Sequence, residues 1–333
     1  NLVFLLDVSG SMNQWNKLPM LKTSLKMLVE QLDVHDTVSI VVYAGSSGLV
    51  LPPTNGSGQE TILNSLENLR AGGSTNGGEG INLAYRVAEE NFIEGGINRV
   101  LLATDGDFNV GVTSNGGLTR LVEEKARSGI YLSVLGFGAG NLNDSMMEEI
   151  SNRGNGNYAY IDNLNEAKKV LVEQMSGTLI TIAKDVKIQV EFNPAHVQAY
   201  RLIGYENRTM ADQDFADDTK DAGEIGSGHT VTAFYEVIPV GVEMNLPELE
   251  ELKYQKTVPS GKASEEMLTV KLRYKQPDGD KSTLLEVPVV DVGGELLDAS
   301  DDFIFAASMA SFGMLLRNSE YQGLLTMEGV EEL

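Results

Sequence analysis

The chain has 333 residues, and its 48 acidic and 25 basic side chains give it a formal net charge of −23. A length of roughly 150 residues per domain predicts two domains. A surface this acidic repels phosphate backbones and anionic lipid headgroups, so we expect no binding to nucleic acid. The chain contains no cysteine, which excludes disulfides and thiolate chemistry. No apolar run approaches the roughly 20 residues needed to span a bilayer, so we expect no membrane insertion by this segment.

The first half of the chain alternates buried strands with amphipathic helices. Continuous apolar runs at 2–6, 37–44, 99–104 and 130–137 predict strands buried on both faces. Leucines at spacings of three and four over 18–32 predict a helix between the first two strands. Further elements are expected as helices at 60–69, 79–91, 118–127, 145–152 and 165–175, and as strands at 48–51 and 158–161. This order predicts a Rossmann-like, doubly wound, mostly parallel sheet over residues 1–178.

The second half changes to a period of two. Apolar residues alternate with polar ones over 186–192, 231–237 and 268–274, which predicts antiparallel strands with one solvated face. We therefore expect a mainly β, sandwich-like domain over 179–333, with 211–228 as an acidic solvated loop. A helix near 300–316 carries an apolar stripe, and we expect it to pack back across both domains. That stripe consists of Phe303, Ala307, Ala310 and Met314.

Three polar segments follow predicted strands or lie in loops at the same edge of the sheet. Residues 7–11 (DVSGS) leave the first strand, residues 72–78 (GGSTNGG) precede a helix, and residues 104–107 (TDGD) leave the strand at 99–104. Ligands of open α/β sheets bind outside the carboxyl ends of the strands. We therefore expect these segments to meet in one pocket.

The residue types in these segments indicate a hard divalent cation. Asp7 and Asp105 supply carboxylates, and Ser9, Ser11 and Thr75 supply hydroxyls. Magnesium prefers such oxygen donors, keeps several waters, and usually takes one or two protein carboxylates. Two carboxylates just neutralise the ion, so an incoming carboxylate can displace a water. Each segment alone is an ordinary turn or cap, and the prediction depends on all three occurring together.

Residues 1 to about 178 resemble a von Willebrand factor type A domain, whose metal-ion-dependent adhesion site is written D-x-S-x-S, then T, then D. This sequence supplies that pattern as Asp7, Ser9, Ser11, Thr75 and Asp105. The resemblance implies that the hydroxyls bind Mg²⁺, with Mn²⁺ or Ca²⁺ as alternatives, and that the aspartates reach the metal directly or through water.

Within that family the chain is similar to the bacterial YfbK-like group. The shared stretches are ATDGDFNVG at 103–111, LGFGAGNLND at 135–144, GNGNYAYID at 154–162, RLIGYENR at 201–208 and DDFIFAASMASFGMLLR at 301–317. This similarity implies a bacterial cell-envelope protein, periplasmic or lipid-anchored outside this segment, with the cytoplasm as an alternative. Because the chain opens on a predicted core strand, we expect the natural protein to extend before Asn1.

We expect the site to bind a partner protein through an aspartate or glutamate carboxylate of that partner. Asn13, Trp15, Asp107 and Asn109 follow the first and third segments and form the expected rim. Trp15 is the only tryptophan. It is typical of an aromatic anchor at a binding surface, and equally of a residue packed on the sheet edge.

A magnesium-dependent phosphoryl-transfer or hydrolase enzyme that uses Asp7 is the alternative. Such an enzyme would need a second acid near Asp7 and a lysine for the phosphate. Ser9 stands where the second acid is expected, and no lysine lies in the three segments. His35, His196 and His229 are scattered along the chain and form no cluster with one another. We therefore expect no catalytic residues.

Overall fold

The computed structural model describes residues 1–74, 77–106, 115–139, 142–174, 177, 179–205, 209–243, 264–294 and 296–332. The chain divides into two compact units. The first contains residues 1–186, 218–229 and 274–282, and the second contains residues 187–217, 230–273 and 283–333. The first unit therefore takes in two segments from the carboxyl-terminal half of the chain.

A six-stranded sheet in the order β3-β2-β1-β4-β5-β6 forms the centre of the first unit. Its strands are β1 (Leu2–Asp7), β2 (Thr37–Tyr43), β3 (Ser47–Asn55), β4 (Asn98–Thr104), β5 (Ile130–Phe137) and β6 (Tyr158–Ile161). All neighbours pair in parallel except β3, which is antiparallel to β2. β3 continues through Pro52 and Pro53, beyond the expected end at 51, because a strand at the sheet edge does not need every amide for pairing.

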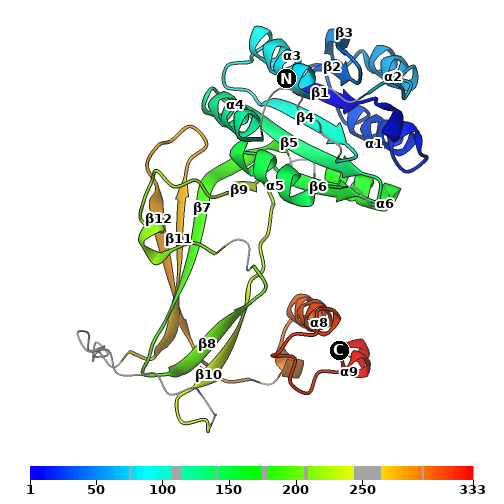
Figure 1. Ribbon diagram of the computed structural model, residues 1–333. Coiled ribbons are helices and arrows are strands. Elements are labelled where there is room, and N and C mark those ends of the chain that lie inside the picture. Colours follow the sequence, from blue (N-terminus) through cyan, green and yellow to red (C-terminus); the bar gives the residue numbers. More distant parts are fainter. Residues whose placement is uncertain are drawn as a thin grey trace. The chain divides into compact units, whose positions relative to one another are not determined.

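Helices cover both faces of this sheet (Figure 1). The helices of the first unit are α1 (Leu18–Val29), α2 (Gln59–Glu67), α3 (Gly77–Glu90), α4 (Asn115–Arg127), α5 (Asp144–Arg153) and α6 (Leu164–Lys168), with a π-helical turn at Lys169–Glu173. Buried residues of α1, α2 and α6 pack with Phe4 on one face, and those of α3, α4 and α5 pack with Leu5 on the other. The predicted doubly wound α/β fold is confirmed.

The carboxyl-terminal half is rich in antiparallel strands, as the period-two pattern predicts. One sheet has the order β12-β11-β7-β9 and a second sheet has the order β10-β8. The strands are β7 (Thr181–Phe192), β8 (Val197–Ile203), β9 (Gly223–Gly226), β10 (Phe234–Pro239), β11 (Glu266–Lys275) and β12 (Thr283–Val290). β10 begins three residues after the predicted start at 231.

The acidic segment 211–228 is more structured than a solvated loop, so that prediction is wrong. It contains a short 3-10 helix at Asp212–Asp214 and the strand β9, and it buries Phe215. β9 pairs with β7 in antiparallel fashion. The acidic composition of this segment indicated solvent exposure. The segment is ordered instead because β9 pairs with β7, which lies about 40 residues earlier in the chain.

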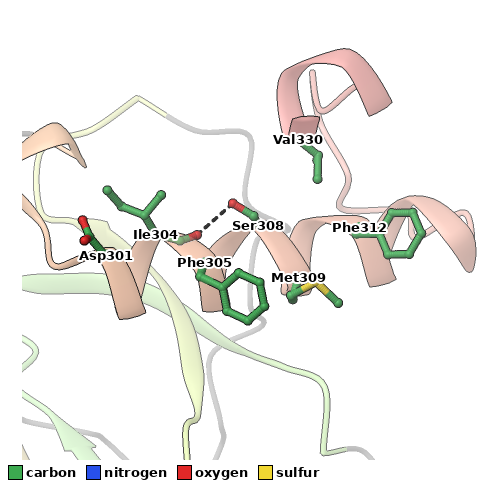
Figure 2. Close-up of a pocket in the computed structure, with 7 residues that line it drawn as sticks. All are labelled: Asp301, Ile304, Phe305, Ser308, Met309, Phe312 and Val330. Carbon is green, nitrogen blue, oxygen red and sulfur yellow. Dashed lines mark hydrogen bonds between the residues drawn. The ribbon is translucent and has the colours of Figure 1, made fainter. Parts of the chain in front are cut away.

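The predicted carboxyl-terminal helix is α8 (Asp301–Leu316), and α9 (Met327–Glu332) follows it. The Ser300 hydroxyl caps α8 by accepting a hydrogen bond from the Phe303 amide at 3.2 Å. The apolar residues of α8 extend beyond one stripe, and several line a groove against Val330 of α9 (Figure 2). Within the described residues, no helix is both long and apolar enough to cross a membrane. Docking of α8 across both domains stays a prediction.

Candidate metal centre

Asp7 is the last residue of β1, and its carboxylate is fully buried at the carboxyl end of the sheet. The Ser9 amide donates to one carboxylate oxygen at 2.8 Å, and the Thr104 hydroxyl donates to the other at 3.3 Å. Thr104 is the last residue of the neighbouring strand β4. The carboxylate is therefore held by the two central strands of the sheet.

Ser9 and Ser11 place their hydroxyls side by side in the turn after β1. The two Oγ atoms lie 2.9 Å apart. Ser9 is buried, whereas Ser11 is exposed. Two ligands at a right angle on a magnesium ion, each about 2.0–2.1 Å from it, are separated by about 2.9 Å. The spacing of the serine hydroxyls therefore fits adjacent positions on an octahedral ion.

The glycine-rich loop that precedes α3 is tied directly to the turn after β1. The Gly72 amide donates to the Val8 carbonyl at 2.8 Å, and the Gly10 amide donates to the Gly73 carbonyl at 3.0 Å. Gly73 has a φ of +84°, which favours glycine. Thr75 itself lies outside the described residues, but the loop that carries it begins next to Ser9 and Ser11.

Asp105 follows β4 and is also buried, at 4% exposure. The next residue, Gly106, has a φ of +92°, and a Cβ there would lie 2.6 Å from the Leu142 Cα. The Gly106 amide donates to the Thr104 hydroxyl at 3.2 Å. A side chain at 106 would displace the turn. The position of Asp105 therefore depends on glycine at 106.

Lys17 contacts Asp105 directly, which the sequence did not predict. Its Nζ atom donates to the Asp105 carboxylate at 2.9 Å, and Lys17 is only 8% exposed. Asp7, Asp105 and Lys17 together carry a formal charge of −1. The expectation of a neutral site counts the two carboxylates alone, and a divalent ion bound beside Lys17 would give Asp7, Asp105, Lys17 and the ion together a charge of +1.

Burial dominates the electrostatics of the aspartate at the end of β1. Desolvation, together with the nearby charge of Asp105, raises the pKa of Asp7 to about 6 against the lowering effect of the hydrogen bonds from Ser9. The Tyr43 side chain is fully buried at the end of β2, and burial followed by the Asp7 charge raises its pKa well above the ordinary value. Because the carboxylates of Asp7 and Asp105 lie close together in a buried site, a cation bound next to them is favoured.

The donor set fits a hard divalent ion. Its described members are the carboxylates of Asp7 and Asp105 and the hydroxyls of Ser9 and Ser11, and all are oxygen ligands at one edge of the sheet. A thiophilic metal would require sulfur ligands, and the chain has no cysteine. These residues would hold the ion, with Ser11 on the solvent side.

The rim residues that the structure describes are exposed. Asn13 ends the 3-10 turn at Gly10–Asn13, and Trp15 is 78% exposed in the segment before α1. Packing of Trp15 on the sheet edge is therefore wrong. Asp107 and Asn109 lie outside the described residues.

Three residues of the site were not among the predicted metal ligands. Lys17 reaches Asp105 from ten residues beyond Asp7, and Thr104 and Tyr43 end their strands beside Asp7. The parallel pairing of β1 with both β2 and β4 brings Tyr43 and Thr104 next to Asp7. In the sequence, Thr104 opens the segment at 104–107 and Tyr43 lies near the end of the apolar run at 37–44, but neither position indicates a contact with Asp7.

Comparison with known proteins gives a family for each half of the chain. The family model of the von Willebrand factor type A domain matches residues 1–174. The model described as "Uncharacterized protein YfbK, C-terminal" matches residues 177–333. Domains of the first family often mediate protein interactions and metal-dependent binding.

Uncharacterized protein YfbK of Escherichia coli is 46% identical over 321 residues, which are 96% of this chain and 55% of that protein. Uncharacterized protein sll0103 of Synechocystis is 27% identical over 55% of this chain and 43% of its own length. The chain thus spans about half the length of the curated relatives it matches.

A solved structure, the von Willebrand factor type A protein from Catenulispora acidiphila, shares the fold at a TM-score of 0.50 and 15% identity, over 93% of this chain and 71% of that chain. The match extends beyond the first domain model and includes most of the β-rich half. The chain belongs to the von Willebrand factor type A family and carries a carboxyl-terminal domain of the YfbK type.

Proposed function

We propose that the chain is a metal-dependent protein-binding module. Asp7, Ser9, Ser11, Thr75 and Asp105 hold a divalent cation, Mg²⁺ in the first instance, and the loaded site binds an aspartate or glutamate carboxylate of a partner protein. When bound, the cation supplies the positive charge that attracts the partner's carboxylate oxygen.

The observation that carries this proposal is the uneven exposure of the oxygen ligands. Asp7, Ser9 and Asp105 are buried, and Ser11, 2.9 Å from Ser9 through their hydroxyls, is exposed. A site with buried carboxylates beneath and an exposed hydroxyl above leaves the solvent side open to a ligand. The exposed Asn13 and Trp15 lie in the adjoining segment, where an aromatic side chain contributes contact area to a partner.

Lys17 strengthens the attraction for a carboxylate. With Lys17 next to Asp105, the loaded site carries a local charge of +1, and a ligand carboxylate neutralises it. The net charge of the whole chain is −23, so a strongly acidic partner is repelled at longer range. We therefore expect a partner that presents one carboxylate among basic or neutral residues.

A nucleophilic role for Asp7 receives little support from this geometry. Its carboxylate is 0% exposed, and its two oxygens accept hydrogen bonds from Ser9 and Thr104. A nucleophile must reach the reacting phosphorus atom, which this burial opposes. Relatives of this family are generally adhesion or scaffold domains.

The cellular setting is part of the same proposal. We place the protein in the bacterial cell envelope, on the similarity to the YfbK-like group that the carboxyl-terminal family model supports. The proposal does not require this segment to enter the membrane.

The test is affinity capture of partners with the intact chain in Mg²⁺, in EDTA, and with the variants Asp105→Ala and Glu30→Gln. Glu30 is an exposed residue at the end of α1, so its variant controls for the loss of one negative charge. A partner retained by the native chain and the Glu30 variant in Mg²⁺, and lost in EDTA and with Asp105→Ala, supports the proposal. A partner that still binds in EDTA, or after its own acidic contact residues are neutralised, contradicts it.

A further inference from the structure

A second group of carboxylates lies in the first unit, away from the site at the sheet edge. Asp185, Asp221 and Glu224 each offer a carboxylate oxygen, and these three atoms lie within 4.8 Å of one another. Asp185 is on β7, Glu224 is on β9, and Asp221 precedes β9. The antiparallel pairing of β7 with β9 is irregular between Ala183 and Val186, which brings Asp185 to the same end of the pair as the other two acids.

Glu224 is the residue that makes this group unusual. Both of its carboxylate oxygens are buried, and neither accepts a hydrogen bond within the part of the chain that the structure describes. Burial raises the pKa of Glu224 well above its ordinary value, and the charges of Asp221 and Asp185 raise it further. Buried carboxylates are costly without a partner, and nearly all buried polar atoms have one. The unpartnered oxygens lie against two further carboxylates, so the group that satisfies them carries a positive charge or a proton.

The neighbouring side-chain cations are bonded to other groups. Lys275 donates to Asp185 at 2.6 Å and to the Asp218 carbonyl at 2.7 Å, and Arg153 donates to Asp221 at 3.1 Å. Arg99 lies close enough to Glu224 for its charge to lower the pKa of that carboxyl.

The Arg99 guanidinium, however, donates through Nη1 to the Ser133 hydroxyl at 2.6 Å and through Nη2 to the Thr181 hydroxyl at 3.1 Å, and its buried Nε forms no hydrogen bond within the described residues. Asp185 and Asp221 are thus each held in place by a cation on one side. Glu224, within 4.8 Å of both through its carboxylate, has no bonded cation among the described residues.

The number of carboxylates favours calcium over magnesium. Magnesium usually binds through one or two protein carboxylates, whereas calcium accepts more of them. The three carboxylate oxygens lie within 4.8 Å of one another, so one ion can contact all three. Asp221 is exposed, which gives an ion access from solvent, and waters would complete a coordination shell of six to eight oxygens.

We propose that Asp185, Asp221 and Glu224 form a calcium site, distinct from the site at the end of β1. The site joins β7 to the segment that carries β9, so within the first unit calcium would fix residues 218–229 to β7. The proposal uses none of the residues of the first site and stands whether or not that site binds a metal.

The test uses the full-length chain in an Asp105→Asn background, which removes the first site. Calcium binding is measured by isothermal titration, and thermal unfolding is followed in EDTA and in Ca²⁺. We expect one calcium site in Asp105→Asn and a rise of about 5 °C in melting temperature when calcium is about 100-fold above its dissociation constant. Adding Glu224→Gln should abolish both responses, and adding the control Glu30→Gln should leave both unchanged.

In EDTA, Glu224→Gln should unfold at the same temperature as its parent or higher, because the native carboxylate has no protein hydrogen bond to lose. A second variant, Asp221→Asn, alters an exposed residue and should weaken calcium binding at least about tenfold. The proposal is overturned if Asp105→Asn binds no calcium, which would indicate that Glu224 carries a proton. It is also overturned if Glu224→Gln retains the full calcium response.

Discussion

Lys17 donates to Asp105 at 2.9 Å inside the candidate metal centre, and both side chains are almost completely buried. This ion pair changes the charge of the site from that of two carboxylates to −1. The effect of Lys17 on cation affinity can therefore be measured separately from its effect on the stability of the fold.

Replacing Lys17 with methionine removes the charge and keeps most of the side-chain volume. We expect Lys17→Met to bind Mg²⁺ more tightly, about tenfold, because one positive charge next to Asp105 is lost. In EDTA the same variant should lose about 3 kcal/mol of stability, because Asp105 is left buried without its cation. Titration calorimetry and urea unfolding measure the two effects. Unchanged magnesium affinity would mean that the lysine charge does not act on the site.

The pH dependence of folding should report on Asp7. Its pKa is raised to about 6 in the folded protein, so the folded state binds this proton more tightly than the unfolded state does. The contribution of Asp7 to stability is therefore greatest below about pH 4, falls as the pH rises through about 6, and is then fully lost. In EDTA at pH 7.5, Asp7→Asn should be more stable than the native chain by up to about 3 kcal/mol, and the difference should shrink towards pH 4. A difference that does not vary with pH would contradict this assignment.

Gly106 should tolerate no side chain. It combines a φ of +92° with a Cβ position 2.6 Å from the Leu142 backbone, whereas Gly95 has a φ of +70° and no atom within 4 Å of its Cβ position. We expect Gly106→Ala to cost about 3 kcal/mol or more and to weaken metal binding, and Gly95→Ala to cost about 1 kcal/mol. Equal losses of stability in urea unfolding of the two variants would show that the turn at Gly106 can relax.

Much of the fold and part of the site could be predicted from the sequence. Continuous apolar runs are characteristic of strands buried on both faces, so β1 and β4 were predictable, and with them the positions of Asp7 and Asp105 at one edge. Lys17 was not predictable, because its approach to Asp105 depends on the path of the turn before α1. Glu224 was not predictable either, since β9 exists only through its pairing with β7, about 40 residues earlier in the chain.

The division of the chain gives a prediction about truncation. Arg99 is buried in the sheet and donates to Thr181, and residues 218–229 and 274–282 belong to the first compact unit. A chain cut after residue 174 should therefore fold but melt below the full chain, because Arg99 loses one of its partners. The comparison requires thermal unfolding of both chains in EDTA. Equal melting temperatures would mean that residues 1–174 are stable without those segments.

The most direct test of the central claim is magnesium binding to the residues at the ends of β1 and β4. Isothermal titration of Mg²⁺ would be performed on the full chain carrying Glu224→Gln, so that the second carboxylate group does not contribute. We expect one magnesium site in this chain, retained with the control Glu30→Gln and lost with either Asp7→Asn or Asp105→Asn. Magnesium binding that persists at full affinity in both aspartate variants would place the cation elsewhere and contradict the account.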